Sequence, residues 1–210
     1  MKPKLLLCLA LVLSSHCRAA IVFPVATEDG RQFAYVKVKE VLQAFPNAFK
    51  GLKISDLTMT NALKVYDTGP KDIVSGHLLS AAELFGWQYL FIHGTNAVCE
   101  VPLAIDPQDG KLIKRGGVSS GEILQATLVA LQKAAELPQV KKQDYECRYL
   151  TVPFLFEAIW LHEKSDDIII PLPPTWGEWN AYQPYSESEI IKLLKPEAEN
   201  KLKQNPDLPD

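Results

Sequence analysis

The chain has 210 residues, of which 47% are hydrophobic and 22% are charged, and its formal net charge is −3. This length and hydrophobic content suffice for one globular domain with its own core, and they exclude a fibrous or wholly disordered chain. The acidic balance argues against nucleic acid as a partner, and against an anionic membrane surface as the main partner.

Residues 1–19 have the three-part pattern of a cleavable signal peptide. Lys2 and Lys4 give a basic start, an apolar run spans Leu5–Leu13, and small or polar residues follow up to Ala19. The apolar run is shorter than the roughly 20 residues of a membrane-spanning helix. The pattern predicts cleavage after Ala19 and a periplasmic or secreted product. Lipid attachment at Cys17 is the competing interpretation.

The chain that remains is expected to form a single globular domain over residues 20–202, followed by a flexible polar tail over residues 203–210. It has no second long apolar segment, so no integral membrane segment is expected after processing. Its two cysteines are Cys99 and Cys147. In an exported protein such a pair predicts one disulfide bond, and the alternative is two buried free thiols.

The first third of this domain gives mixed signals. Residues 21–26 are apolar enough for a strand, and residues 28–30 (Glu-Asp-Gly) suggest a turn. Apolar side chains at helical spacing predict a short helix over residues 35–45. Residues 52–75 fit neither the helical nor the strand period.

The middle of the chain predicts an antiparallel meander over residues 87–115. Residues 87–93 are apolar on both faces, and residues 97–105 alternate between apolar and other side chains. The segment from Asp106 to Gly110 has the proline and glycine of a hairpin loop, and residues 111–115 form the return strand.

The strongest helix signal covers about residues 120–137, with Ser119 or Ser120 as its N-cap. Its apolar stripe consists of Leu124, Leu128, Leu131 and Ala135. Beyond it, residues 149–161 are strongly apolar but interrupted by Pro153, which predicts a strand, a break, and then a strand or a short helix over residues 154–161. Residues 168–170 predict a further strand, and a capping box at Ser186 predicts a final helix. The fold class is therefore α+β: a mostly antiparallel sheet with one main amphipathic helix packed on it, plus terminal helices.

Gly117-x-Ser119-x-Gly121 matches the nucleophile turn of serine hydrolases, and Asp144 and His162 follow in the chain order of a catalytic triad. A true turn of this kind follows a buried, apolar parallel strand. Here the preceding strand is half charged and belongs to a hairpin. Ser119 is therefore interpreted first as a helix cap, and a hydrolase is the alternative.

The segment from residue 171 to residue 185 combines four prolines with four large aromatic residues: Trp176, Trp179, Tyr182 and Tyr185. Aromatic side chains held on a stiff loop favour recognition of a partner or small molecule. The alternative is that the loop folds back and buries its rings in the core of its own domain.

These patterns together predict an exported, non-catalytic binding domain for an unidentified protein or small-molecule ligand. A small serine hydrolase using Ser119 is the first alternative, and a structural component of the cell envelope is the second. No cofactor is expected. No metal site is expected either, because only His77, His93 and His162 remain after processing.

Overall fold

A computed structural model describes residues 20–113 and 117–205, and all structural statements below refer to these residues. The predicted signal peptide, Cys17 and residues 206–210 lie outside the described residues. The described chain has a large, mostly antiparallel sheet and four α-helices, which confirms the α+β fold class. None of these helices combines the length and the apolar character needed to cross a bilayer.

The sheet strands are β1 (Ile21–Val22), β2 (Thr58–Met59), β3 (Leu63–Asp67), β4 (Glu83–His93), β5 (Asn96–Ile105), β6 (Leu112–Ile113), β7 (Tyr145–Val152), β8 (Phe156–His162) and β9 (Ile168–Pro171). The main path runs β6-β5-β4-β3-β7-β8-β9, with β1 beside β7 and β2 beside β4. Neighbours are antiparallel except the pairs β3–β7 and β1–β7. The predicted meander corresponds to β4, β5 and β6, apart from residues 114–116, which are not described.

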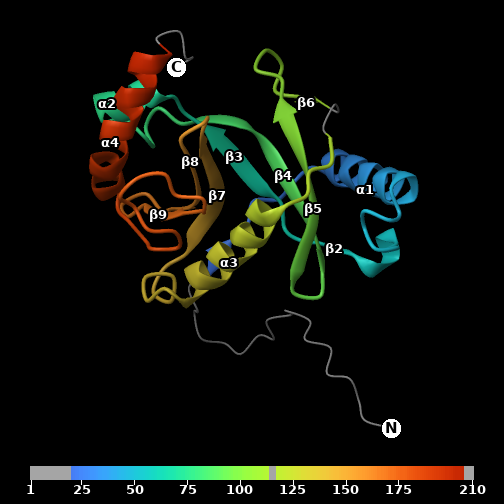
Figure 1. The fold of residues 1–210 in the computed structure, drawn as a ribbon. Helices are drawn as coiled ribbons and strands as arrows, with labels where there is room; N and C mark the ends of the chain where they lie inside the picture. The colour runs from blue at the N-terminus through green and yellow to red at the C-terminus, as the bar shows by residue number, and fades with distance from the viewer. Residues whose placement is uncertain (1–19, 114–116, 206–210) are drawn as a thin grey trace.

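The helices are α1 (Glu28–Ala44), α2 (Pro70–Ser75), α3 (Glu122–Glu136) and α4 (Glu187–Gln204), and a short 3-10 turn, η1, spans Ile54–Asp56. In Figure 1, α3 crosses in front of the sheet, while α1 and α4 lie toward its right and left sides. This arrangement divides the core into three clusters of buried side chains.

Strand alternation decides which cluster each side chain of β7 joins. Tyr145, Cys147 and Tyr149 face α3 and pack with its Ala130 and Ala134. Leu150 and Val152, near the end of the same strand, face the other side of the sheet, where α2 and α4 cover them.

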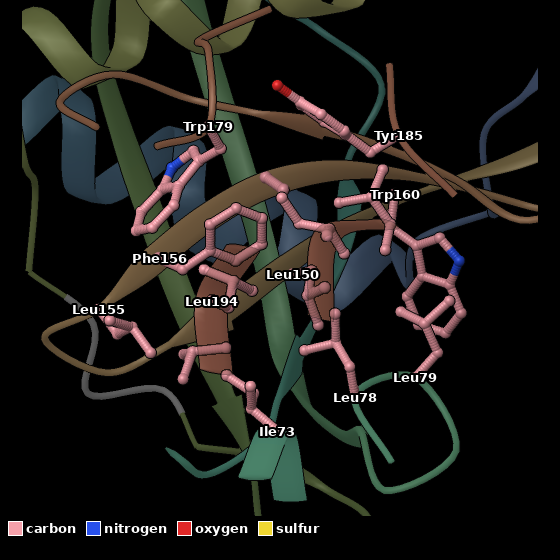
Figure 2. Close-up of a cluster of buried hydrophobic side chains, with 14 of the residues drawn as sticks. Ile73, Leu78, Leu79, Leu150, Leu155, Phe156, Trp160, Trp179, Tyr185 and Leu194 are labelled. Carbon is pink, nitrogen blue, oxygen red and sulfur yellow. The ribbon is translucent and has the colours of Figure 1, made fainter. Parts of the chain in front are cut away.

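Figure 2 shows the cluster under α2 and α4, in which Leu150, Phe156, Trp179 and Leu194 lie together in the core. The third cluster is on the same side of the sheet and packs α1 against β4 and β5. The side of the sheet opposite α3 is thus covered by α1 near β4 and β5, and by α2 and α4 near β8 and β9.

The N-terminal helix is longer than its apolar pattern indicated. The predicted turn at residues 28–30 is wrong, because α1 begins at Glu28. The Thr27 side chain caps it by accepting a hydrogen bond from the Gly30 amide at 3.2 Å. The acidic side chains of Glu28 and Asp29 then occupy the first turn, where the helix dipole favours negative charge.

The two other predicted helices also differ at their ends. The main helix α3 starts after Gly121, which stands at the N-cap without a side-chain cap bond. The predicted serine cap is therefore wrong. Helix α4 continues through Pro196 to Gln204, so the first two residues of the predicted tail are helical.

The predicted disulfide bond is contradicted, because both cysteines are free and buried. Cys99 on β5 belongs to the cluster under α1, whereas Cys147 on β7 belongs to the cluster under α3. The two thiols thus lie on opposite faces of the sheet, and β4 and β3 separate their strands. Three strand spacings of about 4.8 Å exceed the Cα separation that a disulfide can bridge.

We therefore expect two unreactive thiols in the native protein. Burial raises the pKa of Cys99 to about 12 and raises the pKa of Cys147 further. Since the thiolate is the reactive form, neither residue should react with a thiol reagent at pH 8 until the protein unfolds. Intact mass with and without reductant provides the second measurement, and a mass increase of about two daltons on reduction would contradict the arrangement.

Candidate functional site

The three residues of the hypothetical hydrolase triad are not brought together. Ser119 is exposed, and its backbone pairs with Glu100 at the edge of β5. Asp144 accepts a hydrogen bond from the Ala20 amide at 2.7 Å. His162 lies at the end of β8, which is separated from β5 by β4, β3 and β7. No described contact gives Ser119 a histidine base.

The aromatic stretch divides between the core and the surface. Trp179 and Tyr185 are buried, and both belong to the cluster under α2 and α4. Tyr182 is partly buried on the α3 side, where the Lys133 ammonium lies 5.3 Å from its ring centroid. Only Trp176 is exposed, with 70% of its surface accessible. Of the four rings considered for recognition, Trp176 alone presents its surface to solvent.

Trp176 borders a pocket of about 330 Å³ at the end of the β7–β8 hairpin. The hairpin turn provides Phe154, the segment after β9 provides Pro173 and Pro174, and the first turn of α3 provides Ile123. Phe154 is 80% exposed and has a positive φ of 62°, a conformation that a large side chain rarely adopts. Two exposed aromatic rings therefore line an otherwise largely apolar pocket.

The polar residues that line the pocket are Thr151 and Glu157. Glu157 accepts a hydrogen bond of 2.5 Å from the hydroxyl of Tyr149. Burial, together with the neighbouring charge of Glu157, raises the pKa of Tyr149 well above its usual value. The tyrosine is consequently a neutral donor across the physiological range, and its hydrogen bond fixes the Glu157 carboxylate within the pocket lining.

A further carboxyl group, that of Glu100 on β5, lies close enough to Glu157 for the two charges to interact. Burial raises the pKa of Glu100, the Gln88 hydrogen bond opposes this shift, and the Glu157 charge adds to it. The amide nitrogen of Gln88 donates to Glu100, and the Gln88 oxygen is buried without a partner among the described residues. Glu100 and Glu157 thus interact through space although they come from distant strands.

Asp67 extends the acidic character along the sheet. It pairs in register with Thr151 on β7, which pairs in register with Glu157 on β8. Burial raises the pKa of Asp67, and one of its carboxylate oxygens has no partner among the described residues. Of these three carboxyl groups, only Glu157 lines the pocket, where its oxygens can accept hydrogen bonds from a cationic ligand group.

A second polar cluster lies on the opposite side of the sheet, between the areas covered by α1 and α4. The guanidinium carbon of Arg148 lies 4.7 Å from the Tyr66 ring centroid and 4.5 Å from that of Trp160. Its Nε donates to Glu146 at 2.9 Å, and Lys64 approaches the same carboxylate at 3.2 Å. These contacts fix the Arg148 side chain and balance its charge, which is consistent with a role in holding β3, β7 and β8 together.

His162 belongs to the edge of this second cluster. Its Nδ1 lies 2.8 Å from Asp167 Oδ1, and the Trp160 indole nitrogen donates to the same oxygen at 2.7 Å. Asp167 therefore orients both rings. Within the described residues, no group of three or more histidine, cysteine, aspartate or glutamate side chains has a metal-binding arrangement.

Of the residues that line the pocket, Trp176 was a candidate from the sequence, whereas Phe154 and Glu157 were missed although Glu157 carried a signal. Glu157 is the single charge in the apolar stretch from Phe154 to Leu161, and a lone carboxylate in such a stretch indicates a special environment. Arg148 gave a similar signal, because residues 145–149 alternate between aromatic or cysteine side chains and charged ones. The pocket itself depends on tertiary contacts among three separate segments, which no local pattern reveals.

Comparison of the chain with family models, with curated proteins and with solved structures finds no match.

Proposed function

We propose that this chain is an exported, non-catalytic binding domain whose pocket takes a small organic cation with an apolar body. The pocket of about 330 Å³, lined by the Glu157 carboxylate together with the exposed rings of Phe154 and Trp176, is the observation that carries the proposal. Aromatic faces attract cations electrostatically, and a carboxylate accepts hydrogen bonds from an ammonium group. The apolar walls would cover the rest of the ligand.

The export part of the proposal depends on the sequence pattern of residues 1–19. We propose cleavage after Ala19 and a periplasmic or secreted location. A pocket lined by one carboxylate and two exposed aromatic rings suits a protein that meets small amines or peptides in that space.

A binding role is preferred over the two alternatives. The hydrolase hypothesis needs a base next to Ser119, and the described contacts of Asp144 and His162 are made elsewhere. A purely structural envelope component gives no reason for a half-buried carboxylate among the mostly apolar residues that line the pocket, because removing such a group from water is costly.

The proposal is tested by titrating the protein at pH 7 with 2-phenylethylamine and with its neutral analogue 2-phenylethanol. Isothermal titration calorimetry measures the affinity, and tryptophan fluorescence reports on Trp176. We expect the amine to bind more tightly than the alcohol. Glu157→Gln should weaken amine binding about tenfold or more, because a charge-assisted hydrogen bond is lost. Trp176→Ala should weaken it several-fold.

Glu178→Gln is the matched control, because it removes an equal charge from an exposed residue outside the pocket lining. It should leave the amine affinity unchanged. Glu157→Gln retains an oxygen that can accept the Tyr149 hydrogen bond, so the fold should persist, and circular dichroism checks this. Equal binding of amine and alcohol, or an unchanged affinity in Glu157→Gln, would contradict the proposed cation site.

A further inference from the structure

Both backbone groups of Ala20, the first described residue, are engaged by the start of β7. The Ala20 nitrogen donates to Asp144 Oδ1 at 2.7 Å, and the Ala20 carbonyl accepts from the Tyr145 amide at 3.1 Å. The next two residues form β1, which pairs in parallel with β7. Ile21 and Phe23 then pack against the core cluster under α3. The segment that begins at Ala20 is thus part of the folded domain.

Ala20 also follows the bond that the sequence pattern predicts to be cut. Hydrolysis of the Ala19–Ala20 peptide bond breaks its C–N bond, and water supplies a hydroxyl to the Ala19 carbonyl and a proton to the Ala20 nitrogen. A signal peptidase would catalyse this step. The new α-amino group, with an ordinary pKa of about 8, takes up a second proton at neutral pH. The nitrogen that donates to Asp144 as a neutral amide would then carry a full positive charge.

We propose that Asp144 is the binding site for the α-ammonium group of Ala20 created by signal-peptide cleavage. This inference rests on the proposed export of the chain, and it assigns Asp144 a function unrelated to catalysis. The carboxylate already lies within hydrogen-bond distance of the reacting nitrogen, so cleavage converts a neutral hydrogen bond into a charge-assisted one. The result is an anchor for β1 that is stronger in the processed chain than in its precursor.

The solvent exposure of Ala20 and Asp144 determines how much the ammonium–carboxylate pair is expected to stabilise the fold. Ala20 and Asp144 are both exposed, and exposed ion pairs contribute modestly and are screened by salt. We therefore expect the ammonium to shift the unfolding equilibrium by about two- to fivefold at low ionic strength. The shift should shrink toward zero in 1 M NaCl.

The first experiment identifies the natural N-terminus. The full-length chain is expressed in a secreting bacterial host, and intact mass is measured on protein from the periplasm and medium. A chain that begins at Ala20 supports the proposal. A chain that begins at another residue overturns the proposed role of Asp144, and an intracellular chain that retains its leader overturns the export proposal as well.

The second experiment tests the ammonium site independently of export. A chain released at Ala20 from a cleavable fusion retains every described contact, and it is compared with the same chain acetylated at Ala20. Asp144→Asn is the matched variant, because its amide oxygen still accepts a hydrogen bond but carries no charge. Urea unfolding is measured for all four forms.

Acetylation should raise the unfolding constant about two- to fivefold when Asp144 is present, and it should have no effect in Asp144→Asn. An equal response in both backgrounds would overturn the ammonium site, and export would stand if the natural chain begins at Ala20. The 2-phenylethylamine titration does not involve Asp144, so the pocket proposal is judged separately.

Discussion

Replacing Trp179 with alanine is expected to lower the free energy of unfolding by about 3–5 kcal/mol. Only 2% of the Trp179 surface is exposed. Its ring meets the Phe156 ring edge-on, with centroids 6.1 Å apart and an interplanar angle of 78°, and Figure 2 shows the two side chains beside each other. Truncation would open a cavity in the cluster under α2 and α4. Urea or thermal unfolding measures the loss.

Trp176→Ala is the matched control for this experiment, because it removes the same side chain three residues earlier. Trp176 is mostly exposed at the pocket border, so its truncation should change stability by no more than about 0.5 kcal/mol. Equal losses in the two variants would contradict the division of the aromatic stretch into a core residue and a surface residue. A small loss for Trp179→Ala would contradict its packing.

Gly86→Ala is the second substitution for which we expect a large effect, about 3 kcal/mol or more. A Cβ atom at this position would lie 2.1 Å from the Leu103 carbonyl oxygen and 3.0 Å from the Ala104 Cα. Both obstacles are backbone atoms of β5, which pairs with β4 at this point. The two strands would have to separate, and their hydrogen bonds would be disturbed.

Gly117→Ala provides the control for the glycine substitution, because an added Cβ there would meet no heavy atom within 4 Å. It should be neutral or slightly stabilising, since alanine restricts the unfolded chain more than glycine does. Thermal unfolding of the two variants gives the comparison. A Gly86→Ala protein as stable as Gly117→Ala would show that β4 and β5 do not approach each other as closely as described.

The elements that were predicted well have strong local patterns. Alternation in residues 97–105 and the apolar stripe that includes Leu124 and Leu128 require no knowledge of distant contacts, and both elements are present as β5 and α3. The boundaries of α1 were missed because Glu28-Asp29-Gly30 has turn-like composition. The Thr27 cap and the helix dipole make the same residues a suitable first helical turn.

The errors about sites have a different cause. Counting cysteines predicts a disulfide from number and compartment, but it contains no information about the sheet. Strand order puts β4 and β3 between the two cysteine strands, and side-chain alternation points Cys99 and Cys147 to opposite faces. The pocket depends on Phe154 and Glu157 of the β7–β8 hairpin, on Trp176 after β9 and on Ile123 of α3, which come from separate segments. A sequence can indicate that Glu157 is unusual, whereas only the assembled fold shows what surrounds it.

The parallel pairing of β3 with β7 has a consequence for how the chain reaches this fold. It aligns Lys64 with Arg148, and the whole β4–β5–β6 meander and all of α3 lie between these two residues in the sequence. On either side of the β3–β7 pair, strands pair mainly with their close neighbours in the sequence: β4 pairs with β5, and β7 pairs with β8. Since closing a long loop costs more entropy than forming a hairpin, we expect the two flanking hairpins to be early folding units. Formation of the parallel β3–β7 pair would then join the two hairpins in the slow step of folding.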